Sequence, residues 1–207
     1  AGSLLDRMIY QMTPEDFDKV VRNNAKSVFT TSKFAAILFR QQRSGRIVNL
    51  TSDSGLGDVG RSNYAAASEA IVGLTRTTAR DLGKYGVTAN AISPLANTRL
   101  FPGLVEEHRT AAVISPTRDE RAGIGKSPEI QNWHGPGNPD DADNVAPLAV
   151  YLCTYASPNI NGYVLGVRGG SLYVYSNPTP DKVVNKWGNF NMDEMDILFP
   201  KMMGKGF

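Results

Sequence analysis

The chain has 207 residues, which is enough for one domain with a hydrophobic core. Its 22 basic and 20 acidic residues nearly balance, so the charge gives no reason to expect binding to nucleic acid or to an anionic membrane. One cysteine excludes an internal disulfide framework, and neither a membrane span nor a signal peptide is visible, so we expect a cytoplasmic protein.

The first half of the sequence predicts a helix, a strand, a second helix and a second strand. Residues 14–43 predict one long helix or two abutting helices, with Thr13 as the N-cap and Gly45 at the end. The run RIVNLTS predicts a strand buried on both faces, and a glycine-rich loop leads from it to a helix over 62–82. VTANAIS predicts a second buried strand that ends at Pro94.

The second half begins with a region whose composition indicates a loop. Residues 101–140 are rich in proline, glycine and charge, which indicates a loop or substrate lid. DDADNVAPLAVYLCT predicts a helix in which Cys153 is a small buried residue. GYVLGVRGG predicts a third strand, and MDEMDILFPKMM predicts a last helix. Strands that alternate with helices predict a single α/β domain over residues 1–207, with a layered parallel sheet.

Several motifs, in the right order up to about Ser176, resemble the short-chain dehydrogenase/reductase family. AGSLLDRM resembles the end of the family's N-N-A-G segment and its sequel, and NNAKSVF resembles the segment of the active-site asparagine, here Asn24. GRIVNLTSDSG resembles the strand that ends in the catalytic serine, here Ser52. NYAAAS aligns with the Y-x-x-x-K helix, with Tyr64 at the tyrosine and Ser68 at the lysine.

A further motif extends the resemblance to the cofactor. NAISPLANT resembles N-x-I-x-P-G-x-x-x-T, which places the family's cofactor-binding positions on Pro94 and Thr98. LGKYGVTANAISPLANTRL and NVAPLAVYL are similar to the branch that acts on β-hydroxyacyl-CoA thioesters. The resemblance implies a Rossmann-like, doubly wound parallel sheet, NAD(P) as the cofactor, and hydride transfer between nicotinamide and a substrate carbonyl.

Two departures from the family change the expected function. The family opens with a strand, a T-G-x-x-x-G-x-G turn and a helix that hold the cofactor pyrophosphate, and we expect this N-terminal part to be absent. The glycines of DSGLGDVG stand in the wrong context for a phosphate loop. Ser68 is neutral where a lysine would grip the ribose and lower the pKa of the tyrosine. The prediction is therefore that this chain itself binds no cofactor.

Each of these positions also has an ordinary structural interpretation. Asn24 fits a helix kink or a polar helix face, and Ser52 fits a turn cap. Tyr64 fits a half-buried tyrosine with a satisfied hydroxyl, and Ser68 a small packing residue. The two histidines and the cysteine lack the spacing of metal ligands, so no metal site is expected.

Two functions compete on these observations. The first is a catalytically impaired subunit of an NAD(P)-dependent hydroxyacyl-CoA dehydrogenase complex, bound to a homologous active subunit through helices near 14–43 and 62–82. In this it resembles the inactive subunits of hetero-oligomeric hydroxyacyl-CoA dehydrogenases, such as that for (hydroxybenzyl)succinyl-CoA. The alternative is an active NAD(P)-dependent oxidoreductase of hydroxyacyl-CoA or ketoacyl substrates whose N-terminal half lies outside this sequence. A third possibility, an acyl-CoA-binding module, would need only the loop at 101–140.

Overall fold

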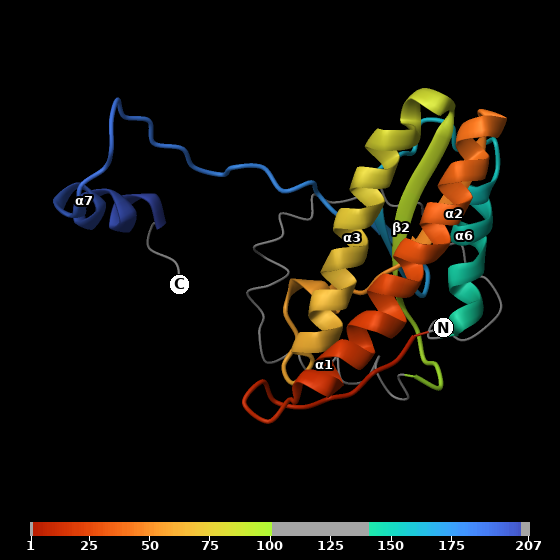
Figure 1. The fold of residues 1–207 in the computed structure, drawn as a ribbon, viewed down its shortest axis with the longest axis horizontal. Coiled ribbons are helices and arrows are strands. Elements are labelled where there is room, and N and C mark those ends of the chain that lie inside the picture. The colour runs from red at the N-terminus through yellow and green to blue at the C-terminus, as the bar shows by residue number, and fades with distance from the viewer. Residues whose placement is uncertain (1, 101–140, 204–207) are drawn as a thin grey trace. The chain divides into compact units, whose positions relative to one another are not determined.

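The computed structural model describes residues 2–100 and 141–203, which belong to two compact units, residues 1–175 and 176–207. The larger unit carries a sheet in the order β1-β2-β3-β4, with helices on both faces (Figure 1). Its strands are Gly45–Leu50 (β1), Val87–Leu95 (β2), Val164–Arg168 (β3) and Ser171–Val174 (β4). Its helices are Pro14–Val21 (α1), Ser27–Gln42 (α2), Ser62–Leu82 (α3) and Ala146–Cys153 (α6), and the smaller unit contains Met192–Met203 (α7).

The sheet confirms the predicted α/β class and adds a strand to it. Strands β1, β2 and β3 are parallel neighbours, as in the predicted Rossmann-like sheet. β4 pairs with β3 in the antiparallel direction and was not predicted. It follows β3 after two residues, Gly169 and Gly170, and Gly169 takes a φ of 53°, which glycine adopts without strain. These glycines, which were expected to end the last strand, form the turn of a hairpin.

The first predicted helix is two helices joined by a π-helical segment, Arg22–Lys26. α1 begins after Thr13, whose Oγ1 accepts a hydrogen bond of 3.1 Å from the Asp16 amide, while the Asp16 carboxylate accepts from the Thr13 amide at 3.4 Å. This reciprocal capping confirms Thr13 as the N-cap.

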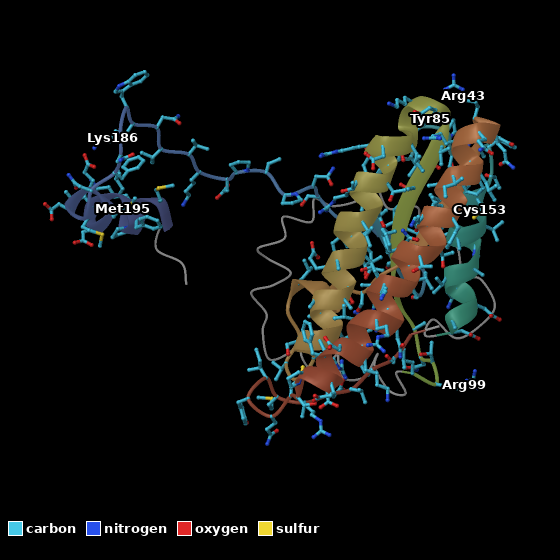
Figure 2. The ribbon with its side chains drawn as sticks, viewed as in Figure 1. Arg43, Tyr85, Arg99, Cys153, Lys186 and Met195 are labelled. Carbon is cyan, nitrogen blue, oxygen red and sulfur yellow. The ribbon has the colours of Figure 1, made fainter. Side chains whose placement is uncertain are left out.

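The end of this helical region differs from the prediction. α2 ends at Gln42, and its C-cap, Arg43, takes the left-handed conformation with a φ of 56°. The Arg43 guanidinium lies 5.4 Å from the centre of the Tyr85 ring (Figure 2). Gly45, predicted as the helix end, opens β1 instead. Any Cβ at Gly45 would overlap the ring of Phe39, so the glycine serves the close approach of helix and strand.

β2 continues through Pro94 to Leu95, although the sequence predicted that Pro94 ends the strand. Along β2 the Ala91 amide donates to Tyr163 on the side of β3, so by alternation the Pro94 nitrogen faces the side of β1. β1 has already ended there, and its last contact is a hydrogen bond of 2.8 Å from the Thr51 amide to the Ile92 carbonyl. Proline therefore removes no hydrogen bond from the sheet at this position.

Apolar side chains from both faces of the sheet form the core. On one face, Ile47 of β1 and Ala89 of β2 pack against Ala79 and Leu82 of α3, together with residues of α2. On the other face, Ile92 and Val167 pack against Leu152 of α6 together with partly buried neighbours of the same cluster. Cys153, predicted to be buried, is exposed at the end of α6 (Figure 2). Only one side of α6 faces the sheet. Leu152 lies on that side, whereas the next residue, Cys153, points away from the sheet.

Two buried hydrogen bonds join β1 and its continuation to α3. Asn49 Nδ2 donates to Thr75 Oγ1 at 2.9 Å, and Thr51 Oγ1 donates to the Ser68 carbonyl at 2.8 Å. Both partners point from the strand toward the helix, because residues 47, 49 and 51 share one face of the sheet. These bonds set the position of α3 along β1.

The lid-like region at 101–140 and both histidines lie outside the described residues. The prediction of a single domain over 1–207 stays a prediction. Among residues 2–100 and 141–203, no helix combines the length and the apolar character needed to cross a membrane.

The bond between Asn49 and Thr75 gives a test of the packing of β1 on α3. Thr75→Val keeps the side-chain shape but leaves the buried Asn49 amide without its acceptor, so we expect the free energy of unfolding to fall by about 1–3 kcal/mol. Thr77→Val, at an exposed position of the same helix, serves as the control and is expected to change it by less than about 0.5 kcal/mol. Urea unfolding of both variants measures this, and equal effects of the two substitutions would contradict the expectation.

Candidate functional site

A cavity of about 580 Å³ opens where β1 and β2 end, between these strand ends, the π-helical segment and α3. All six residues predicted from the motifs line it, namely Asn24, Ser52, Tyr64, Ser68, Pro94 and Thr98. They come from four separate stretches of sequence that the fold brings together. Ligand sites of open α/β sheets lie at this end of the parallel strands, which agrees with the position of the cavity. The roles of the six residues stay predictions.

Ser52 and Tyr64 meet across the loop between β1 and α3. Ser52 follows β1 and caps a 3₁₀ turn, where its Oγ accepts a hydrogen bond of 3.2 Å from the Ser54 amide. Tyr64 lies in the first turn of α3 and is hydrogen-bonded to Ser52. The fully buried Asn63 holds this turn, because its Nδ2 donates to the Leu5 carbonyl at 3.0 Å. The turn-cap interpretation of Ser52 is thus correct, and the same side chain also contacts the tyrosine.

The surroundings of Tyr64 keep its hydroxyl protonated. Burial is the largest effect and raises the pKa of Tyr64 above its ordinary value of about 10. The hydrogen bond with Ser52 and the charge of Arg61 lower the pKa, while the carboxylates of Asp53 and Asp58 raise it. The net shift is upward, so these surroundings favour the neutral phenol.

Ser68 faces the cavity from the same side of α3 as Tyr64, one turn further along. It is only 3% exposed, and its carbonyl accepts the hydrogen bond from Thr51. Its short side chain brings no charge toward the tyrosine. Among the described residues that line the cavity, none carries an ionised side chain at neutral pH. The cavity wall is therefore a neutral surface of hydroxyl, amide and apolar groups.

Asn24 is a buried residue of the π-helical segment, and its side chain is engaged by the backbone. Nδ2 donates to the carbonyls of Ser3 at 2.9 Å and Val20 at 3.0 Å, and Oδ1 accepts from the Ser3 amide at 3.2 Å. A Cβ on Gly2 would come within 2.5 Å of Oδ1. Asn24 thus borders the cavity, but its amide holds residues 2 and 3 in place, which agrees with the local structural interpretation.

A charged network lies behind Ser52 and was not predicted from the sequence. Ser54 Oγ donates to Asp58 Oδ2 at 2.8 Å, and Arg61 pairs with Asp58 at 3.2 Å and with Asp6 at 3.1 Å. Burial opposes the charge of Arg61, but its two carboxylate partners outweigh burial and raise its pKa. The acidic residues of the loop could have indicated such a network. Their partners could not be predicted, because these contacts depend on how the loop folds back on α3.

The glycine-rich turn between β1 and α3 does not suit a pyrophosphate. Anion sites of this kind need free backbone amides and a positive potential. Here the amides of Gly57 and Arg61 donate to the carbonyls of Ser54 and Asp58, and the turn carries the carboxylates of Asp53 and Asp58. This turn therefore does not offer a pyrophosphate site. Within the same residues, no cluster of His, Cys, Asp and Glu has a metal-binding arrangement.

Known proteins are similar to this chain in both sequence and fold. Residues 1–171 match the short-chain dehydrogenase family described as enoyl-(acyl carrier protein) reductase. The hydroxyacyl-CoA dehydrogenase ChsB1 of Mycobacterium tuberculosis is 33% identical over 187 residues, which are 86% of this chain and 52% of that protein. The human (3R)-3-hydroxyacyl-CoA dehydrogenase is 31% identical over 82% of this chain and 59% of its own length. The chain thus spans about half to three fifths of these relatives.

Solved structures agree with the sequence matches. A short chain dehydrogenase from Mycobacterium avium superposes with a TM-score of 0.78 at 29% identity, over 100% of this chain and 63% of that one. The peroxisomal multifunctional enzyme type 2 of Drosophila melanogaster, at 20% identity and a TM-score of 0.72, shares the fold over 99% of this chain and 33% of its own. The chain therefore belongs to the short-chain dehydrogenase/reductase family, in its hydroxyacyl-CoA dehydrogenase-like branch.

Proposed function

We propose that this chain is a catalytically impaired member of its family that serves as a structural or regulatory subunit of an NAD(P)-dependent hydroxyacyl-CoA dehydrogenase. The observation that carries the proposal is the state of Tyr64. Its pKa is raised, and the position one turn further along α3 holds Ser68 and no cation. A family tyrosine acts as a base only when a nearby positive charge favours the tyrosinate. The reaction then depends on the active partner.

The ligand of the cavity is a β-hydroxyacyl or β-ketoacyl thioester. Two kinds of relative support this class, since one group is named for hydroxyacyl-CoA and another for 3-oxoacyl-acyl carrier protein. A volume of about 580 Å³ is in the range of small-molecule sites. The neutral wall suits the acyl part of such a ligand, which carries hydroxyl, carbonyl and hydrocarbon groups. NAD(P), the cofactor of the family, is held by the partner.

The partner binds along α2 and α3. These helices border a groove of about 440 Å³ whose apolar lining includes Phe29, Ile37 and Leu74. Phe29 is 48% exposed and Ile37 is 47% exposed, which is unusual for large apolar side chains unless a partner covers them. Lys33 and Arg40 also line the groove and give the interface a polar border.

The second candidate is an active oxidoreductase. It is favoured by the assembly of all six motif positions around one cavity. In that case, dehydrogenation needs a positive group from outside the described residues to lower the pKa of Tyr64. Binding of NAD(P)H by the purified chain alone, with turnover that is lost in Tyr64→Phe, would favour this candidate and overturn the subunit proposal.

The protonation of Tyr64 is open to direct measurement. We expect the Tyr64 phenol to titrate above its ordinary pKa of about 10 in the natural chain, because burial disfavours the tyrosinate. Ser68→Lys places a cation on the same face of α3 and is expected to lower that pKa. Carbon-13 NMR of tyrosine Cζ, with the signal assigned through Tyr64→Phe, follows the titration. Ala66→Lys adds the same charge at an exposed position on another face of α3 and is expected to leave the pKa unchanged. A Tyr64 that ionises near neutral pH in the natural chain would refute the impaired site.

The groove along α2 and α3 predicts that a homologous subunit binds this chain. Purified from its natural source under native conditions, the chain is expected to carry a homologous subunit that has both the glycine-rich turn and Y-x-x-x-K. Ile37→Arg adds a cation beside Lys33 and Arg40 in the groove and is expected to release this companion, because a buried charge without a partner is costly. Thr30→Arg, outside the groove on the same helix, is the control. Native mass spectrometry and sequencing of the companion decide the outcome, and a chain that purifies alone contradicts the prediction.

A further inference from the structure

The side-chain hydroxyl of Ser68 is not used by the described part of the chain. Ser68 lines the cavity and is only 3% exposed. Its backbone carbonyl accepts the hydrogen bond from Thr51, but its Oγ forms no hydrogen bond within residues 2–100 and 141–203. Buried polar groups of proteins are ordinarily hydrogen-bonded. Ser68 Oγ is therefore an unused hydrogen-bonding group at the candidate site.

Neighbouring hydroxyl groups of the cavity wall are engaged within the protein. Ser27 and Thr31 line the cavity from α2, and both donate to carbonyls of the preceding helical turn, at 2.7 and 3.0 Å. Thr51 donates to the Ser68 carbonyl at 2.8 Å, and Ser52 Oγ donates at 3.1 Å within the turn that it caps. A serine inside a helix often bonds back in the way that Ser27 does, whereas Ser68 does not.

Ser68 Oγ is open to the cavity. Among the side chains that the structure describes, the fully enclosed polar atoms without a partner are Arg76 Nε and Thr88 Oγ1. Ser68 Oγ also lacks a partner but is not fully enclosed, so it keeps some contact with the cavity. Tyr64 and Ile71, one turn before and one turn after it, line the same cavity. This face of α3 is thus the wall, and a ligand in the cavity can reach the hydroxyl.

The chemistry of the wall decides which part of an acyl thioester reaches Ser68. The described wall residues carry no ionised side chain at neutral pH, so they offer no cation to the phosphates of CoA. Burying a charge without a partner is costly, so the phosphates stay in solvent and the acyl end enters, beside apolar residues such as Val28 and Leu50. The polar atom of the acyl group beyond the thioester carbonyl is the oxygen on the β carbon.

We propose that Ser68 is a specificity residue that binds this β oxygen, and that it selects β-hydroxyacyl and β-ketoacyl thioesters over saturated ones. A hydroxyl carries one hydrogen and two lone pairs, so it can donate to a ketone oxygen or accept from a ligand hydroxyl. A saturated acyl chain would cover Ser68 Oγ and leave it without a hydrogen bond, which weakens binding. The inference rests on the proposed function, in that the ligand is an acyl thioester.

Three ligands that differ only at the β carbon test the selection. Isothermal titration of the full chain measures the affinities for butyryl-CoA, for 3-hydroxybutyryl-CoA as both enantiomers, and for acetoacetyl-CoA. In the natural chain we expect acetoacetyl-CoA and the better hydroxy enantiomer to bind about tenfold more tightly than butyryl-CoA, the size of one hydrogen bond made or lost. Equal affinities for all three ligands overturn the inference.

Substitution of Ser68 tests whether this residue causes the preference. Ser68→Ala removes the hydroxyl and introduces a strong helix former, so the preference for oxygen-bearing ligands is expected to fall to about one while the affinity for butyryl-CoA is retained. Ser62→Ala makes the same change at a serine of α3 outside the cavity and is expected to keep the natural preference. If Ser68→Ala does not fold, as judged by circular dichroism, Ser68→Cys decides, because a thiol is only a weak donor.

The outcomes separate the role of Ser68 from the identity of the ligand. If the natural chain and Ser68→Ala show the same preference, the role of Ser68 is overturned and the acyl-thioester site stands. Equal weakening of all three ligands also contradicts the inference, because Ser68 then contacts the thioester carbonyl or only supports the structure. If none of the three ligands binds, the proposed ligand class is itself overturned, and the inference with it.

Discussion

The arrangement of the site depends on the two buried hydrogen bonds between β1 and α3. They join Asn49 to Thr75 and Thr51 to the Ser68 carbonyl, at 2.9 and 2.8 Å. Strand and helix each carry half of the site, since Ser52 follows the strand and Tyr64 and Ser68 lie on the helix. A buried polar group without a partner is costly, so these bonds favour one register between the two elements. That register brings the Ser52 and Tyr64 hydroxyls together.

The electrostatics of the site come from its immediate neighbours and not from the net charge of the chain. The loop after β1 places the carboxylates of Asp53 and Asp58 near Tyr64, where they raise its pKa, while the charge of Arg61 lowers it. Arg61 is itself shared between Asp6 and Asp58. Burial is nevertheless the largest influence on the pKa of the Tyr64 phenol. A lysine at position 68 would have lined the cavity and lowered the pKa of Tyr64, whereas Ser68 adds no charge there.

The fold and the site differ in how much of each could be read from the sequence. Helix α3 was predicted at 62–82 and spans Ser62–Leu82, and the Thr13 cap and the parallel strands were also predicted correctly. Three features were not predicted: the antiparallel β4, the course of β2 through Pro94 and the exposure of Cys153. Each of these depends on what lies beside the element in space. A proline is tolerated where the neighbouring strand has ended, and a cysteine is exposed where its helix turns away from the sheet.

The sequence by itself determined the family, the alternation of helices with the three parallel strands and the six residues around the cavity, because motifs and helix caps are local patterns. Only the tertiary structure decided what those side chains do. It commits the Asn24 amide to the Ser3 backbone and directs the Ser54 hydroxyl toward Asp58. The direction of a hydrogen bond depends on partners distant in sequence or folded into the same turn, and spacing along the chain does not specify them.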